Sequence, residues 1–294
     1  MTTFTKRVFR KLGTLPVEYW RAYRRWDYSR KARTGLVMTF AFPHSLKIKL
    51  YPEGVGPERL YTRLEDMTDY ALVSQFLKPG MRVIDVGANI GLYSILSDKR
   101  VGKDGQVWAF EPSSESHQRL LRNLKVNSAT TVTPIKLALA DEHGLELTLR
   151  RDARARDGDR YLGELTKSNT ATPGDSETIS VTTLDHYFGQ SDGQNHFDFI
   201  KIDVEGAEYA VLRGARRLLV TNPQVVLMLE CQAHHCARMG YTQGEIFVFL
   251  EELGFGIYAW QSKKNAWATD EDILRTSLNI WASRDREKLP VLGK

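Results

Sequence analysis

Two acids, Asp85 and Glu111, each follow a short apolar run that is typical of a β-strand. Asp85 lies inside the stretch Val-Ile-Asp-Val-Gly-Ala-Asn-Ile-Gly at residues 83–91, which predicts a strand, a tight glycine turn and the start of a helix. Such a turn brings backbone N–H groups close to a bound ligand. Gly87 and Gly91 permit positive φ and leave no Cβ in the way of that ligand. The residues therefore predict a nucleotide-like ligand at this turn.

The acid and the spacing distinguish this turn from a dinucleotide site. A dinucleotide turn favours G-x-G-x-x-G and keeps carboxylates away from the pyrophosphate, whereas the order here is D-x-G-x-N-x-G, from Asp85 to Gly91. Asp85 suits a ligand with an ammonium group and no phosphate, and Glu111 is placed to accept hydrogen bonds from both ribose hydroxyls. S-adenosylmethionine (SAM) combines these features. The alternative is that both acids only cap helices.

A second group of acids is expected at the same edge of the sheet. Asp203 ends an apolar run, Glu205 and Glu208 follow it, and Glu230 ends the next run. Ligands of open α/β sheets bind at the carboxyl ends of strands, although Glu205 and Glu208 could also stabilise a helix N-terminus. Asp203 is the first candidate for a general base, and Glu205 is the second. Lys201 would orient or neutralise these acids, unless its side chain faces away from them.

Metal binding is a separate hypothesis for these acids. Hard cations take carboxylate oxygens, so a divalent ion held by Asp203, Glu205 and Glu230 is chemically reasonable, but we expect no metal requirement. The segment 231–236, Cys-Gln-Ala-His-His-Cys, lacks the second ligand pair of a zinc site. Acceptor contact or plain loop structure is the expected role of this segment, and either of its histidines is an alternative base.

The chain resembles the FkbM-type methyltransferases, SAM-dependent enzymes that mostly methylate hydroxyls on sugars, glycolipids and polyketides. The resemblance runs from about Asp66 to Cys231, and the segments that carry it are 83–91, 110–112, 138–144, 181–185 and 200–208. It implies an α/β fold of the class I SAM-dependent methyltransferase (Rossmann-like) type. In that fold a doubly wound, mostly parallel sheet has seven strands, the last of them antiparallel, and the final strands would come from residues 254–261 and 277–282.

The resemblance also implies roles for individual residues. The methionine part of SAM would lie on the glycine turn, the ribose on Glu111, and the adenine along residues 137–139. The implied cofactor-binding residues are Asp85, Gly87, Ala88, Asn89, Gly91, Glu111, Pro112, Ala138 and Leu139. The expected catalytic group comprises Lys201, Asp203, Glu205 and Glu230.

The expected reaction is methyl transfer by in-line displacement to a hydroxyl of a sugar, glycolipid or related small molecule. A methyltransferase of nucleic acid or protein, and a non-catalytic SAM-binding or scaffold protein, are the alternatives. The net charge of +5 is uneven, because residues 1–33 carry ten Lys or Arg against two acids and the remainder sums to −3. This distribution argues against a nucleic-acid channel through the main domain.

The sequence divides into four expected parts. Residues 1–33 form a basic aromatic extension and residues 34–80 a lead-in strand and helix. Residues 81–284 form the methyltransferase domain with a long loop or lid at 150–177, and residues 285–294 form a tail. In a helical extension Tyr19, Tyr23 and Trp26 share a face. This face predicts either contact with an anionic membrane or packing against the domain or a second subunit.

Composition bounds the remaining expectations. A hydrophobic fraction of 42% supports a proper core, and no run approaches the ~18 apolar residues of a membrane span. The start of the sequence lacks an apolar signal core. Two cysteines provide no disulfide framework and indicate a reducing compartment. We therefore expect a cytoplasmic protein, with peripheral contact to the inner face of the membrane as an additional hypothesis.

Overall fold

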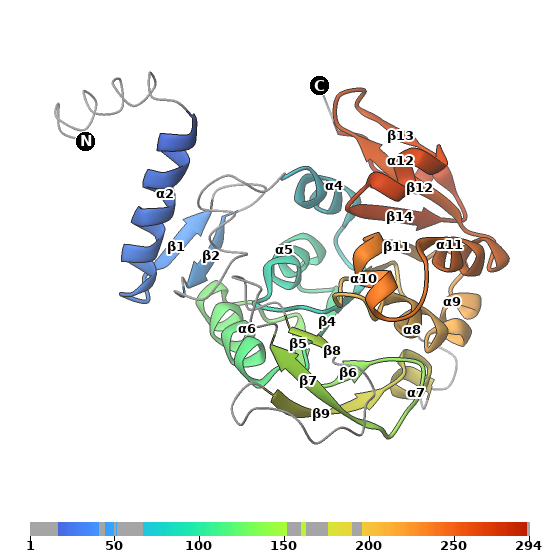
Figure 1. Ribbon diagram of the computed structural model, residues 1–294, viewed down its shortest axis with the longest axis horizontal. Helices are drawn as coiled ribbons and strands as arrows, with labels where there is room; N and C mark the ends of the chain where they lie inside the picture. The colour runs from blue at the N-terminus through green and yellow to red at the C-terminus, as the bar shows by residue number, and fades with distance from the viewer. Residues whose placement is uncertain are drawn as a thin grey trace.

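The computed structural model describes residues 17–40, 45–49, 51, 67–151, 160–162, 176–189 and 196–292. Within these residues the central sheet has eight strands (Figure 1), in the order β13 (Ala266–Ala268), β12 (Gly256–Gln261), β14 (Asn279–Ser283), β11 (Val226–Glu230), β10 (Phe199–Ile202), β3 (Arg82–Val86), β4 (Gln106–Phe110) and β5 (Val132–Ile135). The five strands from β11 to β5 are parallel, and β14 is antiparallel to its neighbours β11 and β12.

This order confirms the doubly wound, mostly parallel α/β fold. The sheet has one more strand than the seven expected, because β12 continues through a short turn into the antiparallel strand β13. The two expected final strands, at residues 254–261 and 277–282, correspond to β12 and β14.

The central strands are apolar because helices cover both faces of the sheet. Successive side chains of a strand point to opposite faces, so Val83 packs in one core and Ile84 in the other. The core with Val83 includes side chains of α4 (Thr68–Phe76), α5 (Leu92–Val101) and α6 (Ser114–Asn127). The core with Ile84 includes side chains of α7 (Leu184–Gly189), α8 (Glu208–Arg213), α9 (Arg216–Thr221), α10 (Ala233–Arg238), α11 (Gln243–Glu252) and α12 (Glu271–Thr276).

A second, smaller sheet lies below the central one in Figure 1. Its order is β6 (Ala138–Leu139), β9 (Ser176–Thr182), β7 (Glu146–Arg151) and β8 (Arg160–Leu162). Most of the expected lid at 150–177 lies outside the described residues, namely residues 152–159 and 163–175. The composition of this segment predicts a loop, but its described residues 160–162 form β8, which pairs with β7.

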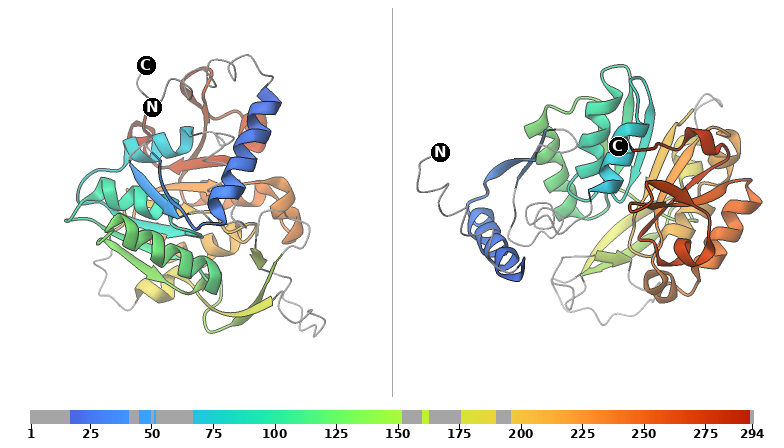
Figure 2. Two further views of the ribbon diagram at one scale, coloured as in Figure 1. Left: turned by 90° about the vertical axis from the view of Figure 1, so that its left-hand side faces the viewer. Right: turned by 90° about the horizontal axis from the view of Figure 1, so that it is seen from above.

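The N-terminal elements lie at the side of the molecule next to α6 (Figure 2). Helix α2 (Val17–Ala32) leads into an antiparallel pair, β1 (Val37–Phe40) and β2 (Leu46–Lys49). The backbone N–H groups of Lys47 and Lys49 donate to the side chains of Asn127 and Asn123 at 2.9 and 3.0 Å. These bonds attach β2 to α6 and thus connect the N-terminal elements to the domain.

The aromatic face expected on the N-terminal extension is partly exposed. Residues 1–16 and the side chain of Tyr19 lie outside the described part. Tyr23 and Trp26 are 48% and 60% exposed, whereas Tyr28 is buried and packs with Ala32. None of the helices in the described part of the chain has the length and apolarity that crossing a bilayer needs. The partner of the exposed face stays a prediction.

The final segment packs against the sheet. After the short 3-10 helix η1 (Arg286–Lys288), Leu289 is buried in the core beside α4 and α5. The indole Nε1 of Trp267 donates a hydrogen bond to the carbonyl of Pro290 at 2.8 Å. Leu289 of the expected C-terminal tail therefore contributes to the core.

Candidate functional site

A cavity opens where β3, β4 and β10 end at the carboxyl edge of the sheet. Counting the space open to solvent, it holds about 820 Å³. Its lining joins polar groups to an apolar wall, and it includes these residues expected from the sequence: Gly87, Asn89, Glu111, Pro112, Ala138, Leu139, Asp203 and Glu205. We call it the glycine-turn cavity.

The glycines of the turn are required by the packing of the chain itself. Gly87 has φ +76, and a Cβ added there would lie 1.8 Å from the carbonyl oxygen of Asp203. Gly91 has φ +91, and its Cβ would lie 2.5 Å from the Cδ1 atom of Leu120. The backbone of Asp203 therefore excludes a side chain at position 87, and the positive φ disfavours one at position 91.

Glu111 is held in one orientation at the wall of the cavity. Its Oε2 atom accepts a hydrogen bond from the backbone N–H of Asn89 at 2.9 Å, and its Oε1 atom accepts one from Ser113 N–H at 2.9 Å. The residue is only 7% exposed. A carboxylate offers about four lone-pair sites, so these two bonds orient the group while it can accept further donors from the cavity.

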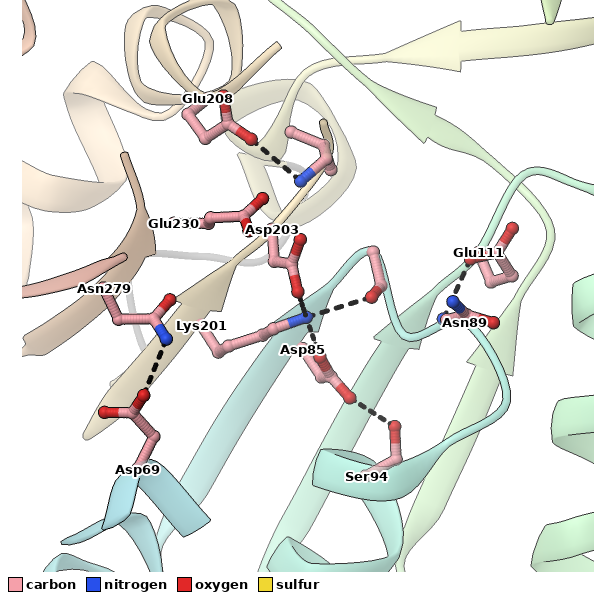
Figure 3. Close-up of polar contacts among 12 residues, drawn as sticks. Asp69, Asp85, Asn89, Ser94, Glu111, Lys201, Asp203, Glu208, Glu230 and Asn279 are labelled. Carbon is pink, nitrogen blue, oxygen red and sulfur yellow. Dashed lines mark hydrogen bonds and ion pairs between the residues drawn. The ribbon is translucent and has the colours of Figure 1, made fainter. Parts of the chain in front are cut away.

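Lys201 lies at the centre of the polar cluster behind the turn (Figure 3). Its Nζ atom lies 3.1 Å from Asp203 Oδ2 and 3.5 Å from Asp85 Oδ1, and it donates to the carbonyl of Gly87 at 3.0 Å. Burial by itself would lower the pKa of Lys201, but the charges of Asp203 and Asp85 outweigh it and raise the pKa. The side chain therefore faces the acids and neutralises them.

Asp85 is sequestered beneath the turn. It is 1% exposed, and its Oδ2 atom accepts a hydrogen bond from Ser94 Oγ at 2.5 Å. Asp85, Ala88 and Gly91 lie outside the lining of the glycine-turn cavity. In this arrangement Asp85 pairs with Lys201, which in turn pairs with Asp203 in the cavity lining. Direct contact of Asp85 with a ligand stays a prediction.

The carboxylate of Glu208 binds backbone N–H groups of its own chain. It is 1% exposed, and its Oε1 atom accepts hydrogen bonds from the N–H groups of Val204 and Gly206 at 3.0 and 3.1 Å. Burial raises the pKa of Glu208 even though these bonds lower it. These contacts support the structural alternative, in which Glu208 stabilises the backbone at the start of a helix.

Glu205 and Glu230 flank the imidazole of His235. The Nε2 atom of His235 lies 3.1 Å from Glu205 Oε2, and its Nδ1 atom lies 3.6 Å from Glu230 Oε2. Burial and the charge of Asp203 raise the pKa of Glu230 to about 7, against the effect of the nearby imidazole. The carboxylate of Glu230 beside the ring, together with Glu205, raises the pKa of His235, although burial opposes them.

A second cavity is lined by residues of α4, α5, β12 and β14. Its lining includes Asp69, Tyr70, Tyr93, Trp260 and Asn279, and it holds about 760 Å³ counting open space. Tyr70 and Tyr93 are stacked with ring centroids 4.6 Å apart, and the Asn279 amide donates to Asp69 Oδ2 at 2.7 Å. We call it the aromatic cavity.

Contacts and register connect the aromatic cavity to the polar cluster. Lys201 Nζ lies 5.3 Å from the ring centroid of Tyr93. Asn279, at the start of β14, is the register partner of Glu230 at the end of β11, so both lie at one edge of the sheet (Figure 3).

The sequence profile of the methyltransferase FkbM domain matches residues 85–257. The chain belongs to the FkbM methyltransferase family. The match includes the glycine turn, Glu111, Lys201 and the acids that follow β10 and β11. The FkbM domain thus contains the whole polar cluster, whereas Asp69, Trp260 and Asn279 of the aromatic cavity lie outside the matched residues.

Curated relatives of this FkbM chain are fungal methyltransferases. Methyltransferase sdnD of Sordaria araneosa is 29% identical over 172 residues, which cover 51% of this chain and 66% of that protein. Methyltransferase 1 of Beauveria bassiana is 26% identical over 143 residues, which cover 45% of this chain and 57% of that protein. The chain therefore spans less than two thirds of the length of these relatives.

The FkbM chain is also similar to solved structures of methyltransferases. A SAM-dependent methyltransferase from Aquifex aeolicus is 16% identical, with a TM-score of 0.41, and the match covers 75% of this chain and 93% of that one. At such a score the fold assignment rests on the strand order of this sheet.

The chemistry of the glycine-turn cavity fits SAM, the cofactor of the FkbM family. The oriented carboxylate of Glu111 matches the two hydroxyls of a ribose, and Ala138 and Leu139 belong to the apolar wall that an adenine requires. The Gly87 turn and Asp203 complete the polar end of the cavity. Lys201 and Glu230, from the expected catalytic group, lie outside its lining.

Some residues of the polar cluster and of the aromatic cavity were not identified from the sequence. Ser94, which binds Asp85, lies in the first turn of α5 and has no distinctive sequence signal. Tyr93 and Asn279 belong to separate elements, and only the fold brings them together. His235 was expected only as an alternative base, and the fold places it between two acids.

Proposed function

We propose that this protein is a SAM-dependent O-methyltransferase whose acceptor is a hydroxyl of a sugar, a glycolipid or a related small molecule. The observation that carries the proposal is the glycine-turn cavity, where the oriented carboxylate of Glu111 and the exposed part of Asp203 face one space inside an FkbM domain. Asp203 is 38% exposed at its side chain, whereas Asp85 and Lys201 are buried behind it.

The residues of the cavity would hold SAM as the family resemblance implies. Glu111 would bind the ribose hydroxyls, Leu137–Leu139 would line the adenine, and the Gly87 turn would hold the methionine part. When bound, SAM supplies the methyl group of its sulfonium, and alignment with the acceptor accounts for much of the rate of such a transfer.

The aromatic cavity supports a polyhydroxylated acceptor. Aromatic rings offer apolar faces on which the C–H face of a sugar can pack, and the carboxylate and amide of Asp69 and Asn279 offer donors and acceptors for hydroxyl groups. Tyr93 of this cavity lies next to Lys201, the partner of Asp203, and we propose that a bound acceptor reaches from this cavity to Asp203.

Asp203 is the proposed general base. A sugar hydroxyl is a weak nucleophile near neutral pH, and transfer of its proton to a positioned carboxylate increases its reactivity. Lys201 holds Asp203 by the ion pair at 3.1 Å, which fixes the direction of the carboxylate. Glu205, which also lines the cavity, is the second candidate for this base.

The first test is calorimetric titration with SAM and with its demethylated product, followed by transfer of labelled methyl groups to sugar and glycolipid acceptors. Binding of SAM and labelling of a hydroxyl are expected. Binding without transfer to any acceptor class would favour a scaffold protein. Transfer to RNA or to a protein instead of the small acceptors would contradict the proposed substrate.

The variant Glu111→Gln is expected to weaken SAM binding by about 10–100-fold. Hydrogen bonds to a charged group contribute about 1.5–3 kcal/mol, and the amide replaces one acceptor oxygen with a donor. Calorimetric Kd values would be compared with those of Glu142→Gln, which changes an exposed acid outside the cavity. An unchanged Kd in a folded Glu111→Gln protein would remove the ribose role.

Trp260→Ala is expected to raise the KM for the acceptor by up to roughly tenfold, since a stacking contact with one aromatic ring contributes about 0.5–1.5 kcal/mol. The Kd for SAM should stay unchanged, because Trp260 lines the aromatic cavity and not the glycine-turn cavity. Initial rates at varied acceptor concentration measure the effect. A higher Kd for SAM with the acceptor KM unaltered would place the acceptor elsewhere.

A further inference from the structure

The cluster of Glu205, Glu230 and His235 comes from three separate segments. Glu205 follows β10 with a left-handed φ of 54, Glu230 ends β11, and His235 lies in α10. One potential ligand atom from each of them lies within 4.8 Å of the other two. Hydrogen bonds keep part of this arrangement in place, since the amide of Gln232 donates to Glu230 Oε1 at 2.8 Å.

Two atoms of the cluster have unmet bonding capacity. Glu230 Oε2 and His235 Nδ1 are buried and make no hydrogen bond within the described part of the chain. They lie 3.6 Å apart, beyond the usual hydrogen-bond range of about 2.7–3.2 Å. His235 as a whole is 9% exposed, so water reaches the ring poorly. Buried polar atoms without a partner are costly, and a bound ion would satisfy them.

Two cationic side chains lie near this cluster, and each contacts other groups. Lys201 is engaged by Asp203 and Asp85, and the Arg238 guanidinium donates to the backbone carbonyl of Glu205 at 2.5 Å. Glu205 and Glu230 both lie beside the imidazole of His235.

We propose that Glu205, Glu230 and His235 form a binding site for a divalent transition-metal ion beside the glycine-turn cavity. Ions of this size bind their ligands at about 2.0–2.2 Å, so adjacent ligand atoms are about 3 Å apart and opposite ones about 4 Å. The 3.6 Å separation of His235 Nδ1 from Glu230 Oε2, the two atoms without a hydrogen bond, falls between these two values. One imidazole and two carboxylates suit Mn²⁺ or Zn²⁺ better than Mg²⁺.

This site differs from the metal hypothesis drawn from the sequence. Asp203, which the sequence places among the ligands, is paired with Lys201, and His235 takes its place. Glu205 lines the glycine-turn cavity, so an ion held there would border the space proposed for the reaction.

The test is titration of the metal-free full-length protein with Mn²⁺, with free ion followed by electron paramagnetic resonance and heat by calorimetry. One ion per chain is expected, with nitrogen coupling from the imidazole in the bound-ion spectrum. His235→Ala and Glu230→Gln should each weaken binding at least tenfold. His196→Ala, which removes an exposed histidine paired with Asp198, should bind as the wild type does. Thermal melts establish that each variant is folded.

Wild-type protein that binds neither Mn²⁺ nor Zn²⁺, or variants that bind as well as the wild type, would overturn the metal site and leave an ion-paired cluster. The titration requires neither SAM nor an acceptor. Methyl transfer that persists without a bound ion would therefore leave the proposed function intact, and ion binding without any transfer would count against the function alone.

Discussion

Lys201→Met is expected to lower the free energy of unfolding by about 3–5 kcal/mol, the usual result of removing one partner of a buried ion pair. The ammonium group lies between Asp85 and Asp203 and also binds the carbonyl of Gly87. Methionine has a similar length but no charge, so the carboxylate of Asp85, which is 1% exposed, would remain buried without its counter-charge.

Urea unfolding followed by circular dichroism measures this effect. Lys136→Met is the matched control, because its ion pair with Glu177 is partly exposed and pairs of that kind contribute about 0–1 kcal/mol. The double variant Lys201→Met/Asp85→Asn should recover part of the loss, since it removes the uncompensated charge. Equal destabilisation by the two single lysine variants would contradict the central role of Lys201.

Asp203→Asn is expected to reduce kcat by about 10²–10⁴, the usual contribution of a general base. Asparagine keeps the shape of the side chain and one acceptor for Lys201, so the Kd for SAM should change far less than kcat. Rates of methyl transfer at saturating acceptor and calorimetric Kd values separate the two quantities.

Two further variants sharpen this test. Asp104→Asn changes an exposed acid far from the cavity and should leave kcat unaltered. Glu205→Gln distinguishes the two candidate bases. A full loss of kcat in Glu205→Gln, with near-normal turnover in Asp203→Asn, would transfer the role of base to Glu205.

Local sequence signals were sufficient for most elements of the domain. The glycine turn at 83–91 predicted β3 and the start of α5, because glycine spacing and apolar runs act over a few residues. Helix α6 has such a local signal at its start, where the side chain of Ser113 accepts a capping hydrogen bond from Ser116 N–H. The hairpin strand β13 was missed, since three residues carry little periodicity.

The acids of the site were also identifiable from the sequence, because each follows an apolar strand and parallel strands end at one edge. Glu111, Asp203 and Glu205 do line one cavity. Residue type and position along a strand thus predict which side chains reach the edge. They do not predict which of those side chains then contact each other.

Partners of the buried groups depend on strand order and crossovers. Lys201 faces Asp85 because β10 lies beside β3 with these two residues in register, 116 positions apart in the chain. Asp69 meets Asn279 across 210 residues, and His235 enters between Glu205 and Glu230 through α10. Turn chemistry and periodicity act locally and are readable in the sequence, whereas these distances arise only when separate segments pack together.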